Sequence, residues 1–184
     1  LTASVTVLAI CYTMIIPFLP IYLLELGVPK ADVALWSGLV FGITFLIAGI
    51  MAPIWGKIAD NKGKKRMALR AGFAIAVSYV LIGMVTDQYQ LLMGRALVGF
   101  ANGFYPAAMT MVSLSVDEKQ VGRALGIFQT GLILGNVIGP FLGGAVESVV
   151  GMRPVFYISG IAVFIATLAV LFLVKEPKLE VENT

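Results

Sequence analysis

Histidine is absent from this 184-residue chain, and cysteine occurs only once, at Cys11. A single thiol excludes an internal disulfide framework, and without histidine the chain lacks the usual ligands of a transition-metal site. Charged residues are also scarce, at 12% of the chain against 59% that are hydrophobic. A soluble domain of this size cannot bury so much apolar surface. We therefore expect a membrane protein without metal or cofactor, and we do not interpret the net charge of +3 as a sign of nucleic-acid binding.

Apolar segments of about 20 residues, the length that spans a bilayer, recur throughout the sequence. We predict an all-α membrane protein with six spanning helices, at residues 3–26, 33–55, 67–85, 91–113, 123–146 and 155–174. The first segment starts at Leu1 without the basic residues or cleavage site of a signal peptide. We therefore expect the sequence to be part of a longer chain.

The lysine and arginine residues of the predicted loops are distributed unevenly. Two of them, Lys30 and Arg153, lie on one side of the bundle. Ten lie on the other side, namely Lys57, Lys62, Lys64, Lys65, Arg66, Arg70, Lys119, Arg123, Lys175 and Lys178. Because basic loops stay in the cytoplasm, we predict that the second side is cytoplasmic, together with both ends of the segment. The expected location is a plasma membrane, and the compact loops favour a bacterial one.

Proline interrupts corresponding helices in the two halves of the bundle. It occurs in the first and second helix of each group of three, at Pro17, Pro20, Pro53, Pro106 and Pro140. Since each group contains an odd number of spans, the second group must be inverted relative to the first. Such 3+3 inverted repeats are typical of transporters, although broken helices also occur in membrane proteins that transport nothing.

Glycine recurs at every fourth residue of the fifth predicted helix, at Gly131, Gly135, Gly139 and Gly143. This spacing leaves one helix face without side chains, so that another helix can approach its backbone closely. Pro140 lies within the stripe and is expected to bend the helix. The second helix carries a similar stripe, made of Gly38, Gly42, Gly49, Pro53 and Gly56. We expect both faces to contact a second body, either another copy of the chain or a missing half. A static interface and a moving one fit the spacing equally well.

Arg95 is the one basic residue well inside a predicted span. Burial of arginine in a membrane is costly, so this position suggests a functional role; the alternative is a side chain that extends to the outer interface. Gly99, Asn102 and Gly103 fall on the same helix face, which favours protein or water as the neighbour of Arg95. Candidates for contact with a solute are the aromatic and amide side chains Tyr12, Tyr22, Asn102, Tyr105 and Asn136.

Acidic residues are missing from the middle of every predicted span. Glu25 and Glu147 lie near the outer ends of the first and fifth helices, and the other acidic residues lie in loops or the tail. A proton-coupled carrier needs a protonatable group in its pathway. If this protein is such a carrier, that group lies outside these 184 residues, or Glu25 serves from the rim.

Two short motifs occur, one in the loop between the second and third helices and one in the fourth helix. The loop GKIADNKGKKR fits the pattern G-x3-D-x2-G-[RK]-x-[RK], through Gly56, Asp60, Gly63, Lys64 and Arg66. Its glycines permit a tight reversal, and its acidic residue can cap a helix or pair with a base. The segment GRALVGFANG fits the pattern R-x2-Q-G, with Arg95 and Gly99 in place and Val98 where glutamine is usual.

A third motif covers the fifth helix and is the most specific. The stretch GIFQTGLILGNVIGPFLGG fits G-x8-G-x3-G-P-x2-G-G at every position, namely Gly126, Gly135, Gly139, Pro140, Gly143 and Gly144. Together the three motifs resemble the major facilitator superfamily, in particular its twelve-helix drug:proton antiporters. The resemblance implies that residues 1–174 are the N-terminal six-helix bundle and that residues 175–184 begin a central cytoplasmic loop.

The resemblance also implies a mechanism. A cavity between two bundles, lined here mainly by the first and fourth helices, would open to each side of the membrane in turn. The second and fifth helices would meet the missing bundle, where Asp60 would belong to a cytoplasmic latch, and Arg95 would support proton coupling. The implied activity is the export of amphipathic, often cationic solutes in exchange for protons, from a bundle surrounded by membrane lipids and without chemistry on the solute.

Alternative functions remain open at this point. The same fold serves facilitators that carry a sugar, a metabolite or a lipid, although the glycine motif of the fifth helix disfavours them. A truncated half that only scaffolds partners is a second alternative, which the length favours and Arg95 disfavours. Two copies of the half could also pair into one carrier.

Overall fold

The computed structural model describes residues 1–174, and within that range every regular element is a helix. The elements are α1 (Thr2–Ile15), η1 (Ile16–Phe18), α2 (Leu19–Glu25), α3 (Val33–Lys62), α4 (Lys64–Gly83), α5 (Gln88–Ala101), α6 (Phe104–Leu114), η2 (Glu118–Gln120), α7 (Val121–Val150) and α8 (Met152–Leu173). They form six spans that are long and apolar enough to cross a membrane. The predicted all-α bundle of six spans is therefore confirmed. Lys175, Lys178 and the predicted loop at 175–184 lie outside the described residues.

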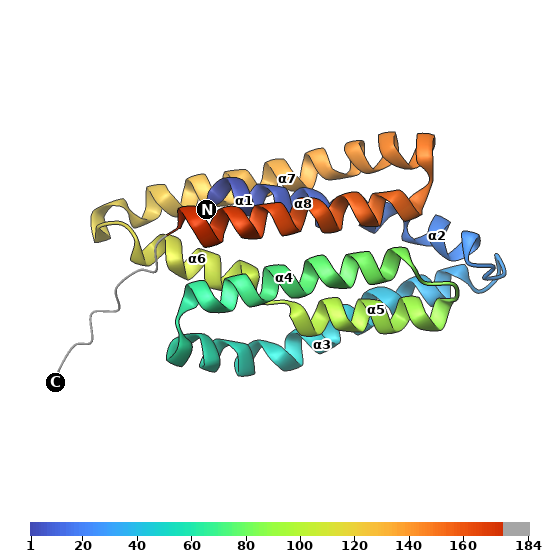
Figure 1. Ribbon diagram of the computed structural model, residues 1–184, viewed down its shortest axis with the longest axis horizontal. Helices are drawn as coiled ribbons and strands as arrows, with labels where there is room; N and C mark the ends of the chain where they lie inside the picture. Colours follow the sequence, from blue (N-terminus) through green and yellow to red (C-terminus); the bar gives the residue numbers. More distant parts are fainter. Residues whose placement is uncertain (175–184) are drawn as a thin grey trace.

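The helices run along the long axis of the molecule, with α7, α1 and α8 on one side and α3, α4 and α5 on the other (Figure 1). Helix α1 packs against α7 and α8, whereas α4 packs against α8, α5 and α6. Helix α3 packs mainly against α5 and is the least covered, since only 17% of its most apolar stretch is buried, against 50% for α4. A large part of α3 is thus without a neighbour inside the described bundle.

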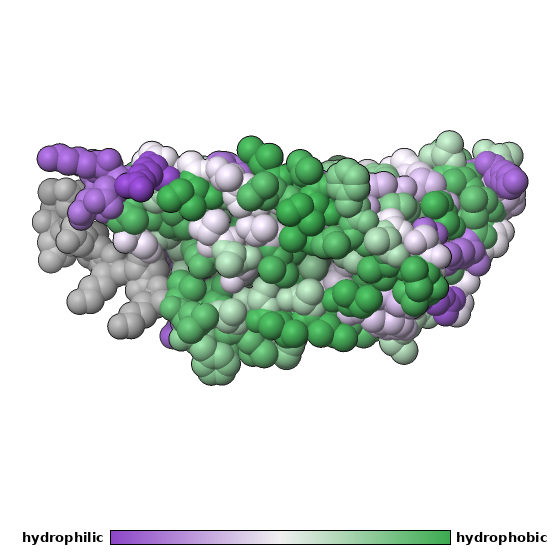
Figure 2. Space-filling view, turned by 90° about the horizontal axis from the view of Figure 1, so that it is seen from above, coloured by the Kyte–Doolittle hydropathy of each residue, from purple (hydrophilic) through white to green (hydrophobic). Residues whose placement is uncertain are grey.

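On the face seen in Figure 2, hydrophobic side chains cover the middle and hydrophilic side chains gather at the two ends. The exposed apolar side chains include Phe45, Ile50, Phe141 and Phe164. Turns at one end join α3 to α4 and α6 to α7, and the turns at the other end join α2 to α3, α4 to α5 and α7 to α8 (Figure 1). An apolar belt between two polar ends is the surface expected of a protein that spans a bilayer.

Two predicted spans are broken rather than continuous. The first span bends through the short helix η1, where Pro17 cannot donate a backbone hydrogen bond. The fourth span, expected to run unbroken over 91–113, stops at Ala101 and restarts at Phe104. Gly103 lies between the two parts with a φ of +134°, a conformation that side chains with a Cβ rarely adopt. Helix α7, in contrast, continues through Pro140.

The charged segment over 56–66 is almost entirely helical, and the loop predicted there was wrong. Helix α3 continues to Lys62, and α4 begins at Lys64. The reversal takes place at Gly63 alone, whose φ of +97° favours glycine. Gly56 lies inside α3 and makes no turn. A long apolar helix can extend past the membrane into basic sequence because lysine and arginine are good helix formers.

Candidate functional site

A cavity of about 300 Å³ lies between the helices, and residues from the middle of six spans line it. Four of the five proposed solute-contacting residues lie in its wall: Tyr12 on α1, Asn102 just after α5, Tyr105 on α6 and Asn136 on α7. Phe45, Tyr79 and Phe104 add three more aromatic side chains. No charged side chain of the described residues lines it. The wall therefore offers aromatic faces for stacking and two amides for hydrogen bonding, but no ionic partner.

Tyr22, the fifth candidate, does not line this cavity. Its side chain is fully buried, and its hydroxyl donates a hydrogen bond of 2.9 Å to the carbonyl oxygen of Ile82. Its ring also packs against Phe156, with ring centres 5.0 Å apart. Tyr22 lies on α2, near the end of the first span and beside the end of α4, whereas Tyr12 lies on α1 in the middle of the bundle. Tyr22 thus joins α2 to α4 and α8.

Arg95 lies inside the bundle with 0% of its side chain exposed. The alternative that it extends to the outer interface is therefore wrong. Within the described residues none of its three guanidinium nitrogens has a hydrogen-bond partner, and the ring of Phe41 lies 5.7 Å away. The backbone of Arg95 does have a side-chain partner, because the hydroxyl of Thr44 donates a 3.1 Å hydrogen bond to the Arg95 carbonyl oxygen. A buried cation without a partner is energetically costly. An anion that binds beside Arg95, or a neighbouring acid that loses its proton, would lower this cost.

The helix face expected to carry Gly99, Asn102 and Gly103 beside Arg95 is interrupted by the break. Gly99 faces α3, where a Cβ would lie 2.5 Å from the carbonyl oxygen of Thr44. Asn102 and Gly103 instead form the connection between α5 and α6, in which the Asn102 side-chain oxygen accepts a 2.8 Å hydrogen bond from the Gly103 amide. Arg95 lies on α5, whereas the fourth span contributes residues of both α5 and α6, and Asn102 between them, to the cavity wall.

The charged turn, residues 56–66 at the junction of α3 and α4, brings its motif residues together at one end of the bundle. Asp60 forms an ion pair with Lys64 across the reversal at Gly63, and the Asp60 side chain is 69% exposed. Of the two roles expected for the acidic residue, pairing with a base is the one observed, because no side chain caps the start of α4. Arg66 is exposed. The pair adds little stability because its acidic partner is open to water, and Asp60 and Arg66 are available for contacts outside the bundle, whereas the Lys64 side chain is only 14% exposed.

The glycine stripe of α7 packs against α1 of the same chain, which corrects the expectation that it meets a second body. A Cβ on Gly135 would lie 2.8 Å from the Thr6 carbonyl oxygen, and one on Gly139 would lie 2.7 Å from that of Ile10. Gly131 and Gly143 face α1 in the same way. Helix α1 could serve as partner because threonine and alanine keep its facing side small. We call this contact the α1–α7 seam.

Other glycines of the same pattern behave differently. Gly144 faces the ring of Phe18, whereas a Cβ on Gly126 would meet nothing within 4 Å. On α3, the positions of Gly38, Gly42, Gly49 and Gly56 are likewise open. Of the two stripes, only that of α3 is thus without a partner in the described bundle.

Two residues with prominent contacts were missed or assigned a smaller role at the sequence level. Trp55 of α3 donates its indole N–H to the Phe100 carbonyl oxygen at 2.9 Å. Arg70, counted above only as a cytoplasmic charge, lies with its guanidinium carbon 3.5 Å from the centre of the Trp55 ring. Phe45 and Tyr79 in the cavity wall were also not singled out. No motif marks any of these positions, because their roles depend on which helices lie next to each other.

Comparison with known protein families decides the identity of the fold. The model for the Major Facilitator Superfamily matches residues 1–184, the whole chain. The chain belongs to the major facilitator superfamily. Membership in this transporter family, together with the six apolar spans, makes it a multi-pass membrane protein.

Curated members of the superfamily resemble the chain over most of its length. It is 43% identical over 166 residues to "Multidrug resistance protein MdtG" of Proteus mirabilis, covering 90% of this chain and 41% of that protein. The protein of the same name from Dickeya zeae is 39% identical, with the same shares covered. The one from Salmonella newport is 40% identical over 173 residues, covering 94% of this chain and 43% of that protein. The chain thus spans about two fifths of the length of these relatives.

Solved structures of major facilitator proteins share the fold. The human organic anion transporter MFSD10 (TETRAN) superposes with a TM-score of 0.82 at 16% identity, covering 96% of this chain and 46% of that one. A bacterial homolog of the human lysosomal transporter Spinster, inward-facing and occupied, gives a TM-score of 0.81 at 21% identity, covering 96% and 43%. At these identities the likeness concerns the fold alone.

Proposed function

We propose that this chain is the N-terminal six-helix bundle of a secondary active transporter that exports amphipathic, often cationic solutes in exchange for protons. The observation that carries the proposal is the cavity in the middle of the bundle, walled by aromatic rings and two amides. Flat apolar solutes of different shapes can stack on such a wall, because it imposes few directional contacts. The identity of 43% to a multidrug resistance protein supports the same activity.

The open stripe of α3 is the surface on which a second bundle would dock. Its glycines leave room for a close approach of another helix, and the apolar side chains beside them are exposed. In this proposal the partner is the second half of the transporter or a second copy of the chain. Movement of the two bodies about this surface would open the cavity to either side of the membrane, driven by differential binding of proton and solute to the two states.

Arg95 and Asp60 have separate roles in the proposed cycle. The buried Arg95 favours negative charge nearby and would thereby keep a coupling carboxyl group ionised until a proton arrives. No carboxylate is buried among residues 1–174, so the acid lies elsewhere in the transporter, or it is the exposed Glu25. Asp60, on the cytoplasmic side of a plasma membrane, would act in the latch between the bundles. Both termini of the segment would lie on that side.

Proton release from acid-loaded inside-out vesicles tests this function. The vesicles carry the native gene product, and a lipophilic cationic dye is added. Dye-triggered proton release that disappears in Arg95→Ala and persists in Arg123→Ala, a control in which an exposed arginine is removed, is the expected result. No release across several chemically different dyes, from folded wild-type protein, would exclude drug:proton antiport and leave a facilitator of another solute.

A further inference from the structure

The break between α5 and α6 exposes backbone groups in the middle of a membrane span. Helix α5 ends at Ala101 and α6 begins at Phe104, so the carbonyl groups before Gly103 lose the partners they have in a continuous helix. Inside a bilayer such groups must find partners within the protein. The amide of Asn102 closes the last turn by donating to the carbonyl oxygens of Val98 and Gly99. The next three carbonyl groups require other donors.

Side chains from two neighbouring helices supply those donors. The indole N–H of Trp55, on α3, reaches the carbonyl oxygen of Phe100 at 2.9 Å. The guanidinium of Arg70, on α4, donates from one Nη to the carbonyl oxygens of Ala101 at 3.4 Å and Asn102 at 3.5 Å. These donors therefore serve three consecutive carbonyl groups.

Arg70 and Trp55 also contact each other, so they act as one unit. The guanidinium carbon of Arg70 lies 3.5 Å from the centre of the Trp55 ring, a cation–π contact that fixes the plane of the guanidinium. Its Nε is buried without a partner in the described residues. A charge that served only to mark the cytoplasmic side would extend into water. We call Trp55 and Arg70 the break clamp.

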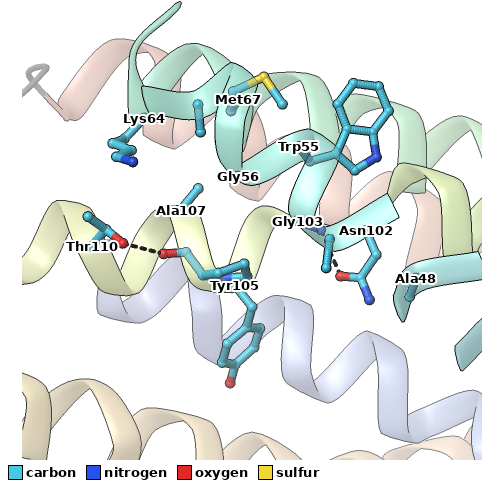
Figure 3. A pocket seen from close by; sticks show the side chains of 13 residues that line it. Ala48, Trp55, Gly56, Lys64, Met67, Asn102, Gly103, Tyr105, Ala107 and Thr110 are labelled. Atoms are coloured by element: carbon cyan, nitrogen blue, oxygen red, sulfur yellow. Dashed lines mark hydrogen bonds between the residues drawn. The ribbon is translucent and has the colours of Figure 1, made fainter. Parts of the chain in front are cut away.

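Two features connect the break clamp with the cavity and with the charged turn. Asn102 and Tyr105, on either side of Gly103, both line the cavity. Figure 3 shows a neighbouring pocket that shares Asn102 and Tyr105 with the cavity; in it Trp55 lies beside Gly103 and Asn102, and the ring of Tyr105 points away from them. In the sequence, Trp55 and Arg70 lie immediately before and shortly after the segment 56–66. The same two side chains thus border the turn and hold the helix break.

We propose that Arg70, stacked on Trp55, is a positioning residue that holds the break between α5 and α6 at one angle and thereby places Asn102 and Tyr105 in the cavity wall. Movement of the turn between α3 and α4 is transmitted through the break clamp to the cavity. The first part of this inference is independent of the transported solute, whereas the effect on solute binding rests on the proposed function.

A distance measurement by pulsed electron paramagnetic resonance tests the geometry. Spin labels at Leu114→Cys and Leu173→Cys, which are 45% and 81% exposed, mark the ends of α6 and α8, which lie at the same end of the bundle (Figure 1), in the native gene product with its other cysteines replaced. Helix α6 has 11 residues, or about 16 Å, so a 15° change at the break moves its end by about 4 Å. Arg70→Ala is expected to shift or broaden the distance distribution by about this amount, and Arg70→Lys, which keeps a donor, by less.

Arg153→Ala is the matched control for the distance measurement. Arg153 also donates from a guanidinium to a carbonyl oxygen at a helix end, that of Val85 at 3.1 Å, but at the far end of the bundle. Its removal is expected to leave the distances unchanged. Unaltered distances in Arg70→Ala would overturn the proposal. If Arg70→Ala is not produced as folded protein, unaltered distances in both Arg70→Lys and Trp55→Phe would do so.

Transport kinetics test the consequence for the cavity. In Arg70→Ala, the KM for a cationic dye is expected to rise about tenfold, which corresponds to about 1.4 kcal/mol, with the maximal rate within about twofold of wild type. Trp55→Phe keeps a ring under the guanidinium but loses the N–H donor, and we expect a rise of about threefold. A loss of maximal rate at unchanged KM would contradict a positioning role. If wild-type protein moves no dye, the proposed function fails, and the distance measurement alone decides the role of Arg70.

Discussion

The α1–α7 seam leads to a quantitative prediction about glycine substitutions. A Cβ on Gly139 would overlap the Thr13 hydroxyl, which donates to the Gly135 carbonyl oxygen. It would also lie 2.7 Å from the Ile10 carbonyl oxygen and 3.1 Å from the Met14 nitrogen, whereas ordinary contacts begin at 3.4 Å. Gly139→Ala therefore requires α1 to move away by about 0.7 Å at this point, and both nearest backbone groups are fixed in a helix. Overpacking of this kind costs about 1–3 kcal/mol. The gain in helix propensity on replacing glycine with alanine returns about 1 kcal/mol, so we expect a net loss of about 1 kcal/mol.

Gly126→Ala provides the matched control on the same helix. Its Cβ would meet nothing within 4 Å, so only the propensity gain of about 1 kcal/mol remains. The two variants should differ by about 2 kcal/mol, or roughly 4–8 °C in the midpoint of thermal unfolding. The midpoint can be followed in detergent through the reaction of buried thiols, including Cys11, which is 3% exposed in the folded state. If Gly139→Ala unfolds at the same temperature as Gly126→Ala or higher, the reasoning about the seam is refuted.

Three further substitutions test the other parts of the site. Arg95→Met removes a buried guanidinium without a partner and should raise the midpoint of thermal unfolding, because such a charge costs about 2.5–3.5 kcal/mol at a helix centre. The same substitution should abolish dye-driven proton release. A lowered midpoint would show that Arg95 has a stabilising partner. Gly42→Leu adds a side chain where nothing lies within 4 Å, so we expect a folded protein whose dye efflux falls at least about tenfold because the second body cannot dock. Normal efflux would exclude contact at this position. Asp60→Asn removes the ion pair between the exposed Asp60 side chain and Lys64, and stability measured by thermal unfolding should change by less than about 1 kcal/mol. The rate of dye efflux should fall, and a wild-type rate would argue against the latch.

The spans were predictable from the sequence, because a segment of about 20 apolar residues has few alternatives to crossing a bilayer as a helix. Gly63 was also recognisable as a point of reversal, since a glycine between lysines ends a helix readily. The extent of α3 and α4 around it was not, because nothing in the basic segment stops a helix. Gly103 was assigned to a helix face although it lies at a break. The carbonyl groups before Gly103 accept hydrogen bonds from Trp55 and Arg70, which are distant in sequence.

The partner of each glycine stripe could not be read from spacing. The stripes of α3 and α7 are alike in sequence, yet only that of α7 is covered, because α1 lies against it. Likewise, Tyr12 and Tyr22 are both aromatic residues of the first span, yet only Tyr12 lines the cavity, whereas Tyr22 contacts α4 and α8. Such differences arise from tertiary contacts, which a single sequence does not contain.

Backbone contact between α1 and α7 has a consequence for how the range of solutes can evolve. The distance between these two helices is set by glycine and carbonyl groups, and no large side chain lies between them at Gly135 or Gly139. The cavity residues Tyr12 and Asn136 lie on the same two helices but are not part of that contact. In the proposed transporter, mutations at such wall positions would change which compounds are accepted while the distance between α1 and α7 stays the same. If the proposed efflux activity is correct, acceptance of new compounds is expected to arise through changes in the cavity wall, with the glycines of the α1–α7 seam left unaltered.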